Sequence, residues 1–180
     1  MTIKNLIDED FVNYKKPSMF IAMPNCSFKC DKECGEPVCQ NSELAAAPSI
    51  EMDDYEIWTR YAQNPITEAI VFGGLEPFDS FEELGAFILK MRSNKENDDD
   101  TIVIYTGYYP EEIKRLLLTF INMKNIIIKF GRFIPNRPSR YDEVLGVELA
   151  SDNQFAKRIE DLELDKWFEE FLEGINNEDK

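Results

Sequence analysis

Histidine is absent from the 180 residues of this chain, and cysteine is confined to one short stretch. The lack of histidine excludes the mixed cysteine–histidine sites that often hold structural zinc. No apolar stretch of signal-peptide length begins the chain, and no apolar run elsewhere approaches the thickness of a bilayer. We therefore expect a cytoplasmic protein, in which thiols stay reduced and disulfides are rare.

Positive charge is also scarce. Lysine and arginine number 20 against 35 acidic residues, which gives a net charge of −15. A surface of this sign repels phosphate, so we expect neither nucleic acid nor an anionic membrane as a partner. The length suits one domain spanning residues 1–180, with a core over about 17–150 and a C-terminal helix over about 162–174.

Four short apolar runs predict the strands of one sheet. They are apolar throughout, which is typical of parallel strands buried on both faces. The runs are Ser18–Met23, Ala69–Phe72, Thr101–Tyr105 and Asn125–Phe130. Residues at helical spacing predict helices over Ile50–Gln63, Ser80–Met91, Glu111–Phe120 and Leu162–Gly174. This alternation predicts an α/β fold with right-handed βαβ connections.

The last third of the chain is harder to assign. Val144–Leu149 predicts one further strand, whereas Phe155–Asp161 fits neither a strand nor a helix clearly. The C-terminal helix is expected to bury one apolar face. That face comprises Leu164, Trp167, Phe168, Phe171 and Leu172.

Distinctive residues follow directly after each predicted strand. The cysteine stretch follows the first strand, Gly73–Pro77 the second, Thr106–Gly107 the third and Gly131 the fourth. Ligand sites of parallel sheets lie at the carboxyl ends of the strands. We therefore expect these four segments to meet at one edge of the sheet.

The four cysteines are Cys26, Cys30, Cys34 and Cys39. Such crowding predicts a centre that binds several thiolates at one point. A single zinc ion is one interpretation, although structural zinc sites usually pair distant cysteines or recruit histidine. An iron–sulfur cluster is favoured, because a cubane several ångströms across suits closely spaced thiolates on one loop. Either three or four of the cysteines could bind it.

The order of these motifs resembles radical S-adenosylmethionine enzymes. The likeness rests on Cys26-x₃-Cys30, on Gly73-Gly-Leu-Glu-Pro77 and on Tyr105-Thr-Gly-Tyr108, each after a strand. Gly131-Arg-Phe-Ile134 and Ser151-Asp-Asn-Gln154 resemble the closing segments of one subgroup, the small activating enzymes of anaerobic ribonucleotide reductase. The resemblance extends from about Phe20 to about Ile159.

The resemblance implies an incomplete parallel (βα) barrel that holds a 4Fe–4S cluster on three cysteines. The fourth iron would chelate S-adenosylmethionine, and an electron from a flavodoxin- or ferredoxin-type donor would release a 5′-deoxyadenosyl radical. That radical would abstract hydrogen from a glycine of a partner glycyl-radical enzyme. A peptide or small-molecule substrate is one alternative. A non-catalytic zinc or iron–sulfur interaction module is another.

By the same resemblance Cys26 and Cys30 are cluster ligands, and the third is Cys39 or Cys34. The family's usual spacing is Cys-x₃-Cys-x₂-Cys, but residue 33 is Glu. We favour Cys39, because Cys39-Gln-Asn41 resembles the family's third cysteine and its following residues. Cys34 is the alternative ligand, and otherwise a spare or structural thiol.

The resemblance also assigns cofactor-binding residues. They are Gly73, Gly74, Glu76, Pro77 and Thr106. Leu75 separates the glycines from Glu76, where the family has them contiguous, and Phe130 stands where the subgroup often has Asp.

Several of these residues also have plainer interpretations. The two glycines could form only a turn, and Thr106 could cap the next helix. Arg132 and Arg137 could neutralise a carboxylate, dock a partner or simply lie on the surface. Phe28 could pack over the cluster or in the core.

Overall fold

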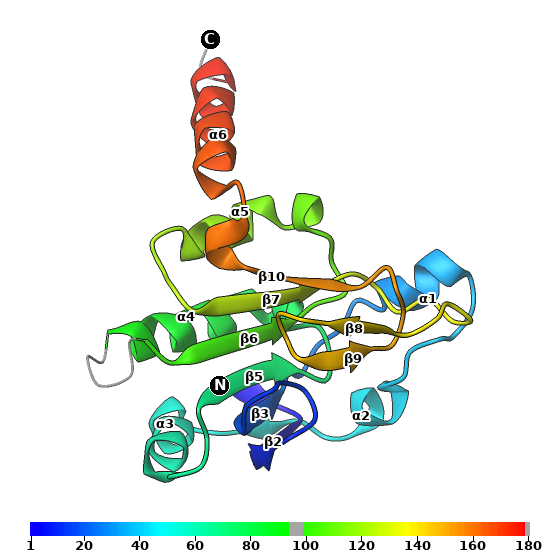
Figure 1. Cartoon of the computed structure of the whole chain (residues 1–180). Coiled ribbons are helices and arrows are strands. Elements are labelled where there is room, and N and C mark those ends of the chain that lie inside the picture. The colour runs from blue at the N-terminus through cyan, green and yellow to red at the C-terminus, as the bar shows by residue number, and fades with distance from the viewer. Residues whose placement is uncertain (94–98, 179–180) are drawn as a thin grey trace.

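A six-stranded sheet forms the centre of the computed structural model, which describes residues 1–93 and 99–178 (Figure 1). Its four inner strands are parallel, and both edge strands run antiparallel to their neighbours. In spatial order the strands are β10 (Phe155–Arg158), β7 (Ile126–Phe130), β6 (Thr101–Tyr105), β5 (Ala69–Gly73), β3 (Ser18–Ala22) and β2 (Asn5–Asp10). The four strands that the apolar runs predict are therefore confirmed, within a residue at each end.

Side chains that alternate along the strands divide the core into two layers. Ile70, Ile102 and Ile128 belong to the larger layer, which packs against the helices. Val71 and Val103 point to the other face, which is covered by a loop and a hairpin. The hairpin consists of β8 (Arg140–Asp142) and β9 (Val147–Leu149) and lies over β6 in Figure 1. Burial on both faces explains why these strands are apolar throughout.

The longer helices follow the predicted order, with some boundaries shifted. They are α3 (Asp54–Gln63), α4 (Phe81–Arg92) and α6 (Leu164–Glu178). Helix α3 begins later than expected, because Asp53 caps it through the amide of Tyr55 at 2.7 Å and Ile50–Glu51 form strand β4, paired with β1 (Thr2–Ile3). The expected helix over Glu111–Phe120 is broken into η2 (Pro110–Glu112), α5 (Lys114–Leu117) and η3 (Leu118–Phe120).

The C-terminal helix α6 was expected to bury one apolar face, but it does so only in part. Figure 1 shows α6 projecting away from the sheet, with only its first turns near α5 and η3. Leu164 is buried, but Phe168 and Leu172 are 42% and 44% exposed. Its apolar face is thus only partly covered. The segment Phe155–Asp161 forms β10 and the short turn of helix η4 (Ile159–Asp161).

The sheet is mixed and open rather than all-parallel. In the described part of the chain, β2 and β10 pair on one side only. The architecture is therefore an α/β fold with a central, mostly parallel sheet and helices. No helix among the described residues is both long enough and apolar enough to cross a membrane.

Candidate metal centre

The cysteine loop leaves the carboxyl end of β3 and contains two short helices that the sequence did not predict. They are α1 (Lys29–Cys34) and α2 (Ser42–Ala46), and neither buries a residue. Phe28 starts α1 from a left-handed conformation with φ of 52°. All four cysteines are free thiols of intermediate exposure. In Figure 1, α1 lies beyond the end of the sheet toward which β5 and β6 point.

Asp31 folds the second half of this loop back toward the first. Its Oδ1 accepts the backbone amides of Val38 and Cys39, both at 2.9 Å. Next, the Asn41 side chain donates to the carbonyl of Gly74 at 2.6 Å, which ties the loop to the end of β5. The residues between Asp31 and Val38, which include Cys34, are partly or fully exposed.

A cavity of about 470 Å³ opens where the loop meets the strand ends. Three thiols line it, those of Cys26, Cys30 and Cys39, whereas Cys34 is not among its lining residues. Among the assigned cofactor residues, the lining includes Gly74, Glu76 and Thr106 but neither Gly73 nor Pro77. The segments after four successive parallel strands therefore meet at one edge, as the order of the motifs predicts.

The two sulfurs nearest the start of the loop have amide donors and are half-buried. The amide of Phe28 donates to Cys26 Sγ at 3.3 Å, and the amide of Phe133 donates to Cys30. Burial raises the pKa of Cys26 to about 11 and also raises the pKa of Cys30. Both groups are therefore neutral thiols in the protein alone, and binding iron would release their protons.

Glu76 lies 6% exposed at the centre of the strand ends. Its carboxylate accepts the Thr106 hydroxyl at 2.7 Å, the Gly107 amide at 2.8 Å and the Phe78 amide at 3.1 Å. Burial raises its pKa to about 7 despite these bonds. The carboxylate thus joins β5 to the turn after β6, a role that the sequence did not suggest.

The other polar atoms assigned to a cofactor also have partners inside the protein. The Thr106 hydroxyl accepts the amide of Tyr108 at 3.0 Å, which forms a local turn rather than a helix cap. The Gly73 carbonyl accepts the Met23 amide at 2.9 Å. Gly74 has φ of 74°, and an added Cβ would lie 2.8 Å from a methyl group of Leu44. The same Cβ would lie 3.0 Å from the Cβ of Ala22, so both the packing and the positive φ favour glycine at position 74.

Two buried cations lie beside the cysteines. Lys129 on β7 lines the cavity, is 7% exposed and donates to the Gly131 carbonyl at 2.8 Å. Arg132 is 6% exposed and lies 3.1 Å from a carboxylate oxygen of Glu33. Both lower the pKa of Cys30, although burial outweighs them. Lys129 is a site residue that was not predicted, and its signal in the sequence is a lone lysine inside an apolar strand.

Both arginines that the sequence singled out have carboxylate partners in the structure. Arg132 neutralises carboxylates, because it also bonds Glu112, which pairs with Lys29 of α1 at 3.1 Å. These pairs connect the cysteine helix to the segment after β6. Arg137 pairs with Asp152 at the surface. It does not line the cavity.

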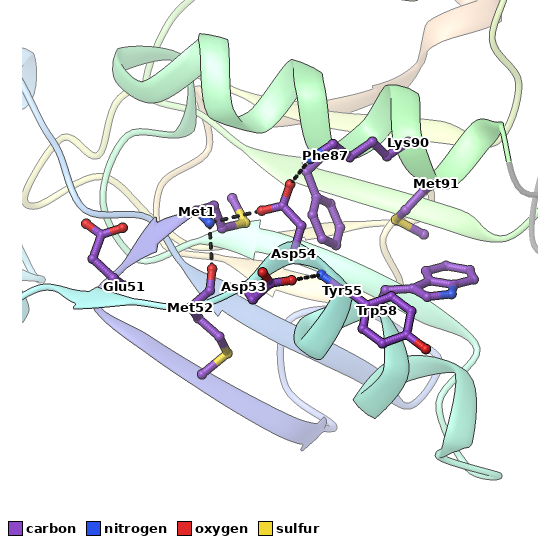
Figure 2. Close-up of a pocket in the computed structure, with 10 residues that line it drawn as sticks. All are labelled: Met1, Glu51, Met52, Asp53, Asp54, Tyr55, Trp58, Phe87, Lys90 and Met91. Carbon is purple, nitrogen blue, oxygen red and sulfur yellow. Dashed lines mark hydrogen bonds and ion pairs between the residues drawn. The ribbon is translucent and has the colours of Figure 1, made fainter.

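A larger hollow of about 770 Å³ lies elsewhere, between α3, α4 and β4. Figure 2 shows Asp54 near its centre, between the amine of Met1 and Lys90, with the rings of Phe87, Trp58 and Tyr55 around it. It shares no lining residue with the cysteine cavity.

Among the described residues, no three cysteine, aspartate or glutamate side chains form a group that could hold a single metal ion.

The arrangement defines a class of protein: an α/β scaffold that presents several thiols at the carboxyl ends of its parallel strands, as an iron–sulfur centre requires. Comparison with known families identifies the member of that class. Residues 17–154 match the 4Fe–4S single cluster domain, and the chain belongs to this family. No curated protein and no solved structure matches the chain.

Proposed function

We propose that the protein is a radical S-adenosylmethionine enzyme that generates a glycyl radical on a partner protein. The bound cluster and S-adenosylmethionine would supply the chemistry. When bound, the reduced cluster would supply the electron that splits the sulfonium into methionine and a 5′-deoxyadenosyl radical, and hydrogen taken from glycine would convert that radical to 5′-deoxyadenosine. The chain itself would hold these groups, orient them and exclude water.

The observation that carries the proposal is that Cys26, Cys30 and Cys39 share one cavity while Cys34 does not line it. Three thiolates on a four-iron cluster leave one iron for an exchangeable ligand. The same cavity extends past Gly74 and Thr106 at neighbouring strand ends. Its volume lies in the range of small-molecule sites.

The rim of the cavity supports a macromolecular substrate. Val12 lines the cavity and is 75% exposed, and its neighbour Phe11 is 63% exposed. Exposed apolar side chains at the mouth of a site are typical of a surface that another protein covers. A glycine-bearing loop of a partner would reach the cavity there.

The decisive experiment is anaerobic reconstitution with iron and sulfide, followed by reduction with and without S-adenosylmethionine. We expect about four irons per chain, an electron paramagnetic resonance signal that shifts when S-adenosylmethionine is added, and release of 5′-deoxyadenosine. Cys30→Ser is the matched control that should hold no intact cluster. A loaded, reduced protein that neither shifts its signal nor releases 5′-deoxyadenosine would overturn the enzymatic proposal.

A second candidate is a cluster protein that binds no S-adenosylmethionine and acts in electron transfer or as an interaction module. It is favoured by the internal bonds of Glu76 and Thr106, whose polar atoms already have partners. The same reconstitution separates the two candidates. Reversible reduction with an unchanged signal in S-adenosylmethionine would favour the second.

A further inference from the structure

We propose that Lys129, as a buried ammonium in the cavity wall, raises the reduction potential of the cluster. The inference depends on ligation by Cys26, Cys30 and Cys39. It does not depend on cleavage of S-adenosylmethionine.

Lys129 lies close to the place where the cluster would bind. Lys129 lies on β7 and lines the same cavity as the three cysteines. Its positive charge acts on Cys30, where it favours the thiolate. The Lys129 ammonium is also 6.0 Å from the centre of the Tyr105 ring, and Tyr105 lines the cavity too. The cation is therefore part of the cavity wall and not of the outer surface.

Burial of the Lys129 ammonium costs free energy. A buried ammonium is expensive unless a group of opposite charge lies nearby. Among the described residues, the structure gives Lys129 one hydrogen bond, to the neutral carbonyl of Gly131, and no carboxylate within ion-pair distance. Burial lowers the pKa of Lys129 to about 8, and the negative charge of Glu76 acts against this through space. The ammonium therefore has no direct ion-pair partner among the described residues, and an anionic cluster would add a compensating charge.

The charge of Lys129 is opposite in sign to that of the cluster. A 4Fe–4S core with three thiolates carries a net negative charge, and one added electron makes it more negative. A nearby cation stabilises the reduced state more than the oxidised state, so it raises the potential. The whole chain, at −15, acts in the opposite direction. Lys129 would therefore offset that field where the electron arrives.

Arg132 does not serve this role equally. It is buried beside Cys30 as well, but Glu112 and Glu33 both pair with it. Its net charge toward the cluster is largely cancelled by these two carboxylates. Of the two buried cations at this edge, Lys129 is the one with no carboxylate within ion-pair distance among the described residues.

The test is a potentiometric titration followed by electron paramagnetic resonance, without S-adenosylmethionine. Lys129→Met keeps the length of the side chain and removes the charge. We expect its midpoint potential to shift to more negative values, and Lys129→Arg to remain near the parent. Because the signal comes only from loaded clusters, incomplete loading does not prevent the measurement. If Lys129→Met does not fold, Lys129→Gln provides the same comparison with a polar neutral side chain.

Lys157→Met is the matched control. Lys157 lies exposed on β10, opposite Ile128 of β7, so the same charge is lost outside the cavity. We expect no shift. An unchanged potential in the neutral Lys129 variants would overturn the inference, and so would an equal shift in Lys157→Met. Because no cofactor is added, failure here leaves the proposed cleavage reaction to be decided by its own experiment.

Discussion

The side chain of Asp31 accepts the backbone amide of Cys39 at 2.9 Å, across a seven-residue excursion of the loop that contains Cys34. This bond brings a cysteine that is distant in sequence to the cavity of Cys26 and Cys30. It suggests how an enlarged cysteine loop can still supply three ligands.

The first prediction concerns the identity of the third ligand. Cys34→Ser should reconstitute with the iron and sulfide content of the parent, because Cys34 does not line the cavity. Cys39→Ser should lose most of its iron, as should Cys26→Ser. Iron and sulfide analysis after anaerobic desalting measures this. Loss in Cys34→Ser with retention in Cys39→Ser would assign the ligand to Cys34.

The second prediction concerns Asp31 itself. Asp31→Ala removes the acceptor of the Val38 and Cys39 amides, so an iron chelator should strip the cluster several-fold faster. Asp31→Asn keeps an oxygen acceptor and should lose iron at nearly the parental rate. Bleaching of the visible absorbance measures both rates. Equal loss in the two variants would mean that the carboxylate charge matters, and not its hydrogen bonds.

The third prediction compares two glycines with the same conformation. Gly74 and Gly35 have φ of 74° and 73°, but only Gly74 has neighbours where a Cβ would go. Gly35→Ala should cost about 1 kcal/mol of unfolding free energy, from backbone strain alone. Gly74→Ala should cost about 2 kcal/mol more, because its Cβ would overlap Leu44 and Ala22. Urea denaturation of the cluster-free proteins measures both, and equal costs would contradict the packing argument.

The fourth prediction concerns the ion pairs of Arg132. Burial raises the pKa of Glu112, but Arg132, the Tyr109 amide and Lys29 together outweigh it, so the pKa of Glu112 is lowered to about 2. Arg132→Met should reduce the unfolding free energy by about 2 kcal/mol, less than for a fully buried pair because Glu112 and Glu33 are partly exposed. Arg137→Met, at an exposed pair that water screens, should cost much less unfolding free energy than Arg132→Met. Similar losses in both would contradict this ranking.

The fifth prediction is a pH dependence of the cluster-free protein. Burial raises the pKa of Glu76 from 4.5 to about 7, so the folded state retains a proton that the unfolded chain has lost between these values. The contribution of Glu76 to the free energy of unfolding is fully present below pH 4.5. It decreases by about 3 kcal/mol as the pH rises to 7. Urea titrations of the parent and Glu76→Gln across this range measure it. The variant should lack this decline, whereas the exposed Glu68→Gln should keep it.

The sequence predicted the inner sheet well, because strands buried on both faces are apolar throughout. Strand β2 was missed because Asn5–Asp10 is rich in carboxylates, which an edge strand tolerates on its open side. Strand β10 was ambiguous for a similar reason, since Lys157 and Arg158 are exposed. Such strands are determined by their neighbours more than by their own pattern.

The position of the site could be predicted from the sequence, but the hydrogen bonds that connect its segments could not. The strand-end rule brought the cysteine loop, Gly74 and Thr106 to one edge. Nothing in the residue order showed that Glu76 would bond Thr106 and Gly107, or that Asp31 would turn the loop. These contacts depend on side-chain directions, which only the assembled sheet fixes.

Helices α1 and α2 bury no residue, and polar contacts attach the loop that carries them to the sheet. The apolar layers of the sheet do not depend on that loop, so the scaffold is expected to fold before any iron arrives. Maturation would then take place in two stages: the apoprotein folds first, and the iron–sulfur cluster is inserted afterwards. Cells starved of iron would accumulate a folded, protease-resistant precursor rather than an unfolded chain.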